Sequence, residues 1–297
     1  ADETKKSIVT LTGVTSELDL SNDIRESSRS VAGVIISKTD KDLLILTEKD
    51  TIDDTDSIKV TFEDGTLADG WIQDSDEISD LAVVKVFSKD LSEETTAYVE
   101  AANFVDSGET KIGDPIIALS VGYVSFGMVT SQPYLSLCDG SYRRINTDII
   151  GKNEDGGVLI NLEGQIIGVL GPDIKEGDSS TLNGVEILEI GNLVNALANK
   201  TTLPYLGITG KNVTDALAKE LGMPKGIIVM QTEEGSPAMK NGIQPTDVIT
   251  ALDDSSVEDY MNILRKKKPG DTVSVNLWRK WKNDYKETKI TITLAKR

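Results

Sequence analysis

Histidine is absent from all 297 residues of this sequence. Serine–histidine and cysteine–histidine catalysis both use an imidazole as the base, so neither mechanism is open to this chain on its own. Zinc sites built on histidine are excluded for the same reason. The single cysteine, Cys138, also excludes an internal disulfide and cysteine-rich metal sites. These absences remove several common hydrolytic chemistries.

Cys138 lies beside the Asp-Gly pair of the segment CDGS (138–141), which is typical of a tight turn. We expect its thiol to be exposed in a loop. A cysteine nucleophile needs a lowered pKa and a nearby base, and no histidine can supply that base. An incidental or structural role is therefore the favoured interpretation.

Long apolar runs are missing as well. No stretch approaches the ~18 consecutive apolar residues of a membrane span, and the first residues, ADETKKSIVT, lack the apolar core of a signal peptide. The protein is therefore expected to be cytosolic, or its numbering starts after a removed leader or anchor.

The net charge of −18 argues against nucleic acid and anionic lipid as partners, because both are polyanions.

Up to Leu170 the sequence consists largely of short strand patterns separated by turns. They include AGVIIS (32–37), LLILT (43–47), SIKVTF (57–62), LAVVKV (81–86), GGVLINL (156–162) and GQIIGVL (164–170). Many short strands with regular turns favour a β-barrel or a β-sandwich. A helical pattern follows at 189–200, and the next segment, TTLP, resembles a linker.

Residues 205–297 change character. A helix is predicted after Thr214, which can cap it, and Gly222 is expected to end it. The segment GIIVMQT predicts a buried strand, and VEDYMNILRKK predicts a second, amphipathic helix. The last two segments alternate apolar and polar residues, as paired strands do. The pattern predicts a small α+β domain.

Several segments match, in order, the motifs of one protein family. AGVIISKTDKDLLILTEKD matches its glycine-valine-isoleucine strand and ILTNxHVV segment, SDLAVVKV matches TDLAVLKV, and GGVLINLEGQIIGV matches GGPLVNLDGxVIGI. PYLGI and GSPAMKNGIQPTDVITALDDSSV match the PDZ signature. The sequence thus resembles the HtrA/Deg-type serine proteases over nearly its whole length. The resemblance implies a mostly β fold, with a chymotrypsin/trypsin-like double β-barrel over 1–199 and a small α+β PDZ domain over 200–297.

The resemblance also locates the positions of the catalytic triad. The family's histidine falls on Asp50, its aspartate on Asp80, which is retained, and its nucleophilic serine on Asp155. An oxyanion-loop glycine falls on Asn153. A serine needs a base such as imidazole, and each oxyanion-hole donor is worth about 2.7–4 kcal/mol of the barrier. The first domain is therefore interpreted as a pseudoprotease, with no catalytic residue expected to function.

Asp50, Asp80 and Asp155 converge if the fold follows the resemblance, and three interpretations stay open. Neutral drift in a relaxed cleft is favoured, with Lys49 or Lys152 nearby to offset the charge. A Ca²⁺ site is the second, because Ca²⁺ takes several carboxylate oxygens. A dyad of the aspartic-protease type, in which two carboxyls share a proton, is the third. No cofactor is expected.

The PDZ resemblance implies a groove for peptides. In the family, a loop of the pattern aromatic–apolar–Gly–apolar binds a C-terminal carboxylate. In this sequence the loop consists of Tyr205, Leu206, Gly207 and Ile208. The glycine lets backbone N–H groups converge on the carboxylate, and the peptide adds as a strand beside the loop's own strand. Leu206 and Ile208 are expected to line one side of the pocket, and Met261 and Leu264 the other. Alternatively, these four side chains simply fill the domain core.

The combined prediction is a catalytically inactive binding or regulatory protein whose PDZ domain captures C-terminal or unfolded peptide segments. The resemblance implies an extracytoplasmic setting in the bacterial cell envelope, with a membrane anchor upstream of this chain. Its role is then protein quality control, or regulation of an active HtrA-type relative. The alternative is an active serine-type endopeptidase with non-standard catalytic residues, which the absence of histidine disfavours.

Overall fold

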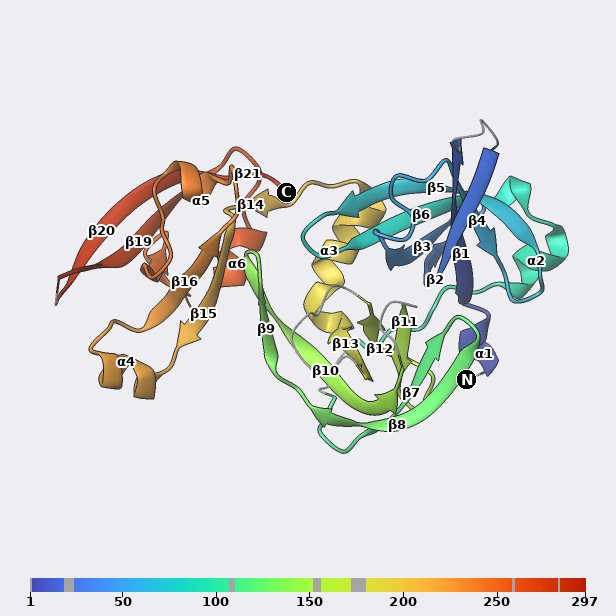
Figure 1. Cartoon of the computed structure of the whole chain (residues 1–297), viewed down its shortest axis with the longest axis horizontal. Helices are drawn as coiled ribbons and strands as arrows, with labels where there is room; N and C mark the ends of the chain where they lie inside the picture. Colours follow the sequence, from blue (N-terminus) through green and yellow to red (C-terminus); the bar gives the residue numbers. More distant parts are fainter. Residues whose placement is uncertain are drawn as a thin grey trace. The chain divides into compact units, whose positions relative to one another are not determined.

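The computed structural model describes residues 2–18, 24–106, 110–151, 156–171, 180–257, 260–282 and 284–297. The chain divides into two compact units, which are described separately below. The first comprises Ala1–Pro133 and Arg143–Thr201, and the second comprises Tyr134–Tyr142 and Thr202–Arg297. Figure 1 colours the chain by sequence, so the long C-terminal part of the second unit runs from orange to red. The proposed domain boundary after residue 199 stays a prediction.

Antiparallel strands close into the first barrel of the first unit. They are β1 (Ile8–Leu18), β2 (Ile24–Lys38), β3 (Asp42–Glu48), β4 (Ser57–Thr61), β5 (Leu67–Asp76) and β6 (Leu81–Phe87). Their order around the barrel is β1-β2-β3-β6-β5-β4. A tight turn joins β4 to β5, and Gly65 has a φ of +84° in it, a value that glycine adopts without a steric penalty.

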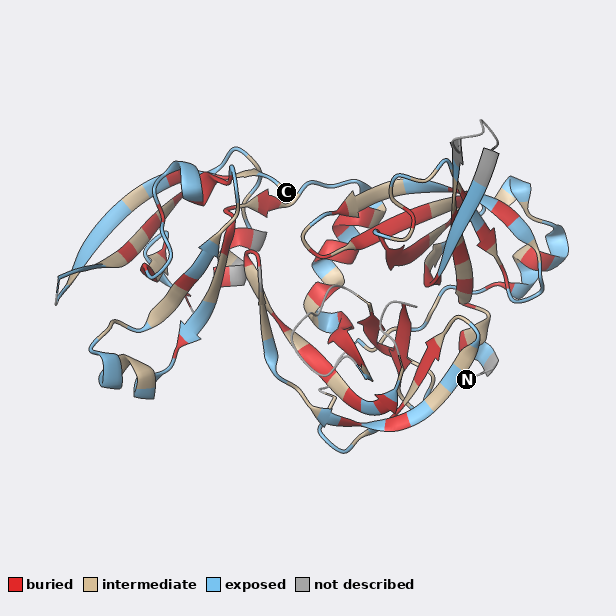
Figure 2. Cartoon of the chain, viewed as in Figure 1, coloured by how far each residue is buried: buried red, intermediate tan, exposed pale blue. Residues whose placement is uncertain are grey.

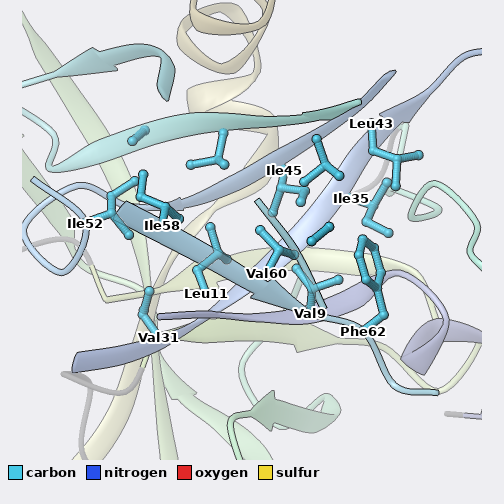
Figure 3. Close-up of a cluster of buried hydrophobic side chains, with 14 of the residues drawn as sticks. Val9, Leu11, Val31, Ile35, Leu43, Ile45, Ile52, Ile58, Val60 and Phe62 are labelled. Atoms are coloured by element: carbon cyan, nitrogen blue, oxygen red, sulfur yellow. The ribbon is translucent and has the colours of Figure 1, made fainter. Parts of the chain in front are cut away.

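Alternate apolar residues of these strands build the barrel core. Since successive side chains of a strand point to opposite faces, Leu43 and Ile45 of β3 and Ile58 and Val60 of β4 all point inward. Figure 3 shows these side chains packed with those of β1 and β2. The strand patterns at 43–47 and 57–62 are therefore confirmed.

The second barrel closes in the same way. It consists of β7 (Pro115–Ser120), β8 (Tyr123–Ser131), β10 (Gly140–Ile150), β11 (Gly157–Ile160), β12 (Ile166–Leu170) and β13 (Thr181–Glu186). The sheet runs β13-β12-β11-β7-β8-β10, and pairing of β10 with β13 closes the ring, while the short strand β9 (Tyr134–Leu137) adds to β10 outside it. Strands β11 and β12 are buried along their whole length, which explains their continuous apolar sequence. The predicted double-barrel fold of trypsin type is confirmed.

Short helices and one longer helix complete the first unit. They are α1 (Asp2–Lys5), the 3₁₀ turn η1 (Ser88–Asp90), α2 (Glu93–Tyr98) and α3 (Ile187–Asn199). Helix α3 buries Ile190, Leu193 and Leu197 on one face and ends at Lys200, whose φ is +52°. The helix predicted at 189–200 is confirmed. Within the described ranges, no helix combines the length and apolar character needed to cross a membrane.

The second unit is a small α+β domain, as predicted. Its elements are β9 (Tyr134–Leu137), β14 (Pro204–Tyr205), β15 (Ile208–Val213), α4 (Asp215–Leu221), β16 (Gly226–Thr232), α5 (Pro237–Lys240), β17 (Val248–Leu252), β18 (Ser255–Ser256), α6 (Tyr260–Arg265), β19 (Thr272–Trp281), β20 (Asp284–Thr293) and β21 (Ala295–Lys296). The main sheet runs β15-β16-β17-β19-β20. Buried and more exposed positions alternate along β19, so one face of the sheet covers the core (Figure 2).

The ends of helix α4 follow its sequence signals. The Thr214 hydroxyl accepts a hydrogen bond from the Leu217 N–H at 3.3 Å, which satisfies one of the free donors of the first turn. Gly222 ends the helix with a φ of +61°. Both predicted boundaries are confirmed. They could be predicted because helix capping depends on single residues at the helix ends, which can be recognised in the sequence.

Candidate functional site

The predicted carboxylate-binding loop, residues 205–208, has the backbone geometry for that role. Gly207 has a φ of +88°, a conformation that residues with a Cβ rarely adopt. A Cβ built on Gly207 would also lie 2.2 Å from the Cβ of Ser236. Only glycine therefore fits here without a shift, and its conformation turns three successive N–H groups toward one point.

That point is occupied by the side-chain carboxylate of Asp139. The Leu206 N–H donates to its Oδ2 at 2.7 Å, and the Gly207 N–H lies 2.9 Å from both oxygens. The Ile208 N–H donates to Oδ1 at 3.0 Å. These distances are normal for N–H···O hydrogen bonds. Three successive N–H groups of the loop are thus all bonded to one side-chain carboxylate of the same unit.

Two further hydrogen bonds hold Asp139. The Tyr260 hydroxyl donates to Oδ1 at 2.9 Å, and the Asp139 N–H donates to the Ile208 carbonyl oxygen at 2.7 Å. The residue is only 4% exposed. Burial raises the pKa of Asp139, while the three amide donors favour its ionised form. The aspartate is thus a fully hydrogen-bonded buried acid.

Cys138 precedes Asp139 in the turn between β9 and β10, and its thiol is buried. The expectation that it is exposed was wrong. The backbone bond from Asp139 to Ile208 draws the turn against the loop, and the cysteine is covered with it. Burial raises the pKa of the Cys138 thiol, with the Asp139 carboxylate acting in the same direction. This environment opposes a thiolate nucleophile.

A cavity of about 200 Å³ adjoins the loop within the second unit. Its lining combines apolar and polar side chains from the start of β10, from β15 and β16, and from the segment at the start of α6. The lining residues are Gly140, Ser141, Ile208, Gly210, Asn212, Ile227, Val257 and Tyr260. The cavity lies beside β15, the strand that is expected from the sequence to pair with a peptide.

Only some of the residues predicted to line the groove do so, and the predicted set also includes residues of the core. Ile208 lines the cavity, and Leu206, Ile208 and Leu264 all belong to the buried apolar core of the unit. The side chain of Met261 lies outside the described residues, so its role stays a prediction. Val257 and Tyr260 also line the cavity. The sequence predicted Met261 and Leu264 for this part of the lining, and Leu264 belongs to the core.

Asp139, Tyr260 and Val257 were not anticipated as site residues. Asp139 lies 67 positions before Leu206 along the chain. In the sequence it appears only as part of an Asp-Gly turn, which predicts a hairpin but not what the hairpin touches. No pattern in the sequence connects the two segments.

In the first unit, Asp50 and Asp80 are neighbours. The Asp50 N–H donates to Asp80 Oδ1 at 2.9 Å, and the Lys49 N–H donates to the Asp80 carbonyl oxygen at 2.9 Å. Burial, with the Asp50 carboxylate acting in the same direction, raises the pKa of Asp80 to about 6. Lost hydration and a nearby like charge both favour the protonated acid.

Lys49 was expected to offset this negative charge, but its ammonium group pairs with two other carboxylates. Its Nζ forms an ion pair with Asp53 and a second one with Glu77 at 3.0 Å. The hydrogen bond with Asp53 is the main cause of the raised pKa of Lys49. The lysine lowers the pKa of Asp80 only as the smallest of several influences. Asp80 is thus left largely uncompensated by this cation.

Asn153 and Asp155 lie outside the described residues, as does Lys152. The triad-equivalent, calcium-site and acid-dyad interpretations that involve Asp155 stay predictions. The next residue, Gly156, forms a parallel bridge with Ala32, and its carbonyl oxygen accepts from Ser120 Oγ at 2.5 Å. In the part of the chain that the structure describes, no three acidic, cysteine or histidine side chains gather closely enough to hold a metal ion.

Each of the two units matches a known protein family. Residues 31–169 match the family of trypsin-like peptidase domains, and residues 204–294 match the family of PDZ domains. Together with the two barrels and the α+β unit, these matches define the class as a trypsin-like peptidase domain followed by a PDZ domain.

Curated relatives narrow the class further. The serine protease Do-like HtrA of Bacillus subtilis is 28% identical over 93% of this chain, and that of Lactococcus lactis strain IL1403 is 28% identical over 91%. A serine protease HtrA-like protein of Staphylococcus aureus is 26% identical over 99% of the chain. The chain is therefore similar to the HtrA serine proteases over almost its whole length.

The relatives are longer than this chain. It spans 66% of the Bacillus protein, 72% of the Lactococcus protein and 41% of the Staphylococcus protein. Among solved structures, the HtrA-type protease AlgW with a decapeptide has a TM-score of 0.70 at 22% identity, covering 100% of this chain and 97% of AlgW. The serine endoprotease from Yersinia pestis has a TM-score of 0.63 at 23% identity, covering 100% of this chain and 96% of that one. These likenesses show a shared fold.

Proposed function

We propose that this protein is a catalytically inactive HtrA homologue whose PDZ domain binds peptides by their terminal carboxylate. The absence of histidine from the whole chain carries the proposal, because hydrolysis by a serine on this fold needs an imidazole base. Catalysis is lost, and recognition is the function that remains.

The residues at the triad-equivalent positions cannot replace the triad. Position 50 carries a carboxylate in place of an imidazole, and Asp155 offers a carboxylate in place of the serine hydroxyl. An acyl transfer to Asp155 would have to pass through an anhydride. Asn153 also alters the loop that supplies an oxyanion donor in the family. Each change alone is severe, and together they leave no route for serine-type hydrolysis.

Peptide binding is supported by the loop at residues 206–208. Three N–H groups converge on one carboxylate there, at distances of 2.7–3.0 Å. A terminal carboxylate could use the same donors, and its chain would then add as a strand along β15. Ile227 and Val257 give the cavity beside β15 an apolar part. We therefore propose ligands that end in apolar residues, or unfolded segments that present them.

We further propose that this recognition serves protein quality control in the bacterial cell envelope, or regulates an active HtrA-type relative by mixed assembly. Similarity to the HtrA serine proteases supports this setting. An anchor upstream of the chain belongs to the same proposal. Peptides and protein C-termini are the proposed partners.

The second candidate is an active endopeptidase with non-standard residues. One observation favours it: the raised pKa of Asp80, about 6, brings one acid of the former triad close to neutral pH. Such an enzyme still needs a nucleophile or an activated water, and a carboxylate dyad is the only form this site could offer.

Binding of peptides by the full chain tests the proposal. The probe is a pool of fluorescein-labelled decapeptides whose last three positions carry Val, Leu, Ile or Phe, measured by fluorescence polarisation. Peptides with a free carboxylate are expected to bind at least tenfold more tightly than the same pool with C-terminal amides. Equal binding of acid and amide would overturn the carboxylate mechanism, and no binding of either would overturn peptide recognition by this site.

A further inference from the structure

We propose that Asp139 is a built-in ligand of the 205–208 loop, and that a peptide C-terminus binds this PDZ domain only by displacing it. The inference rests on the proposed peptide-binding function and concerns the regulation of that same site. The resting groove is then closed at its carboxylate end by the protein's own hairpin.

The hydrogen bonds make the two ligands mutually exclusive. The N–H groups of Leu206, Gly207 and Ile208 all donate to the Asp139 carboxylate. These donors converge on one point, and two carboxylates of like charge cannot occupy that point at the same time. Peptide binding therefore requires that Asp139 leave.

The hairpin copies a peptide in a second respect. The Asp139 N–H donates to the Ile208 carbonyl oxygen at 2.7 Å, as a strand added beside β15 would do. Gly140 and Ser141, the next residues of the hairpin, line the cavity beside β15. Residues 139–141 thus occupy both the carboxylate position and the entrance of the groove. Figure 1 shows β9, the strand that leads into this turn, in green.

The contact is also one that a peptide can replace. Every hydrogen bond that the structure describes for Asp139 comes from a backbone N–H or from the Tyr260 hydroxyl, and none comes from a Lys or Arg side chain. An incoming peptide brings an equivalent carboxylate. It adds main-chain hydrogen bonds along β15 and side chains for the cavity, which the short hairpin does not supply. Exchange then favours peptides that fill the groove well.

The expected consequence is a lowered apparent affinity. When the binding-competent form is a fraction of the population, the apparent Kd rises by the inverse of that fraction. Weakening the hold on Asp139 should therefore tighten peptide binding. This is opposite to the effect expected if Asp139 were only a support for the loop.

Cys138 supplies a direct reporter, since it is the only cysteine of the chain, is buried, and precedes Asp139. Its rate of labelling by a maleimide reports how often the hairpin leaves the loop. In the wild-type full chain we expect slow labelling that the free-acid peptide pool accelerates at least tenfold and the amide pool does not. Unchanged labelling at a saturating peptide concentration would overturn displacement.

Variants test the same idea by affinity. Asp139→Asn removes the charge and should tighten binding of the free-acid pool about tenfold. Tyr260→Phe removes one hydrogen-bond donor to Asp139 without changing the charge, so it should tighten peptide binding by a smaller factor. It is the replacement test if Asp139→Asn does not fold. Asp40→Asn, an exposed aspartate of the first unit, has the same change in charge and should leave binding unchanged.

The outcomes separate the two proposals. If the wild type and Asp139→Asn bind the peptides equally, the inference fails and the proposed binding function stands. If neither chain binds any peptide, peptide recognition itself fails, and the inference fails with it. Tighter binding in Asp139→Asn and in Tyr260→Phe, with Asp40→Asn unchanged, supports both.

Discussion

Asp139 in the second unit and Asp80 in the first are both withdrawn from water, and their surroundings differ sharply. Asp139 accepts hydrogen bonds from three backbone N–H groups and a hydroxyl. For Asp80 the structure describes one backbone N–H donor, and the carboxylate of Asp50 lies nearby. The recognition proposed for the second unit relies on backbone N–H groups, which most substitutions leave in place. The loss of catalysis proposed for the first unit requires only changes of side chain, at positions 50 and 155.

Gly207→Ala should lower stability and peptide binding more than any other substitution proposed for this protein. An alanine at a φ of +88° is strained by about 1–3 kcal/mol, and its Cβ meets Ser236 in addition. We expect the free energy of unfolding of the second unit to fall by about 3 kcal/mol and peptide binding to be lost. Urea titration and fluorescence polarisation measure the two effects.

Gly222→Ala is the matched control for that variant. Gly222 also has a positive φ, +61°, but a Cβ there would have no neighbour within 4 Å. A loss of about 1 kcal/mol with unchanged peptide binding is expected. If both alanine variants lost binding equally, backbone strain alone would explain the result, and the convergence of N–H groups at the loop would not.

Asp139→Ala should have the next largest effect. It leaves three buried amides without their acceptor, and each unsatisfied group costs about 1–3 kcal/mol. Because the hairpin can move away and let water reach the loop, we expect a net loss of about 2 kcal/mol in the free energy of unfolding of the second unit. Asp40→Asn should change it by less than about 0.5 kcal/mol. Equal losses in both would contradict the account.

The Asp80 carboxyl should titrate with a pKa of about 6. Carbon-detected NMR of the side-chain carboxyl measures this value directly. Asp50→Asn removes the neighbouring charge and should lower the pKa of Asp80, though not to its ordinary value, because burial contributes most of the shift. An Asp80 pKa near 4 in the unmodified chain would show that burial at this position has no such effect.

The smallest effect concerns the stability of the first unit. Since the folded-state pKa of Asp80 is raised, this residue contributes most to stability at low pH, and the contribution is lost as pH rises from about 4 through about 6. Asp80→Asn should remove this dependence and raise the free energy of unfolding at pH 7 by about 1 kcal/mol, a figure reduced for the solvent screening of a partly exposed group. Denaturation curves of both chains at pH 4, 5, 6 and 7 test the sign. A variant less stable at pH 7 would contradict it.

Much of the fold could be predicted from the sequence, because it rests on local patterns. The alternation in β4, the continuous apolar runs in β3, β11 and β12, and the caps at Thr214 and Gly222 can each be recognised within a few residues. The glycine of the carboxylate loop was found in the same way, since Gly207 is part of a short motif.

The occupant of the loop could not be predicted. The contact between Asp139 and Gly207 joins residues 68 positions apart, and a turn signal at Asp139 says nothing about what the turn packs against. For the same reason the thiol of Cys138 was expected in solvent and is buried. Long-range contacts of this kind depend on the folded arrangement and leave no periodic mark.

The most direct test of the central claim, that recognition is kept and hydrolysis is lost, is cleavage of an unfolded protein substrate by the purified full chain. Fluorescein-labelled casein is incubated with the wild type and with Asp155→Ala, each with and without the free-acid peptide pool. The account predicts no cleavage above the buffer control in any of the four reactions. Cleavage by the wild type that Asp155→Ala abolishes would contradict it, and would require carboxylate chemistry on a trypsin-like scaffold.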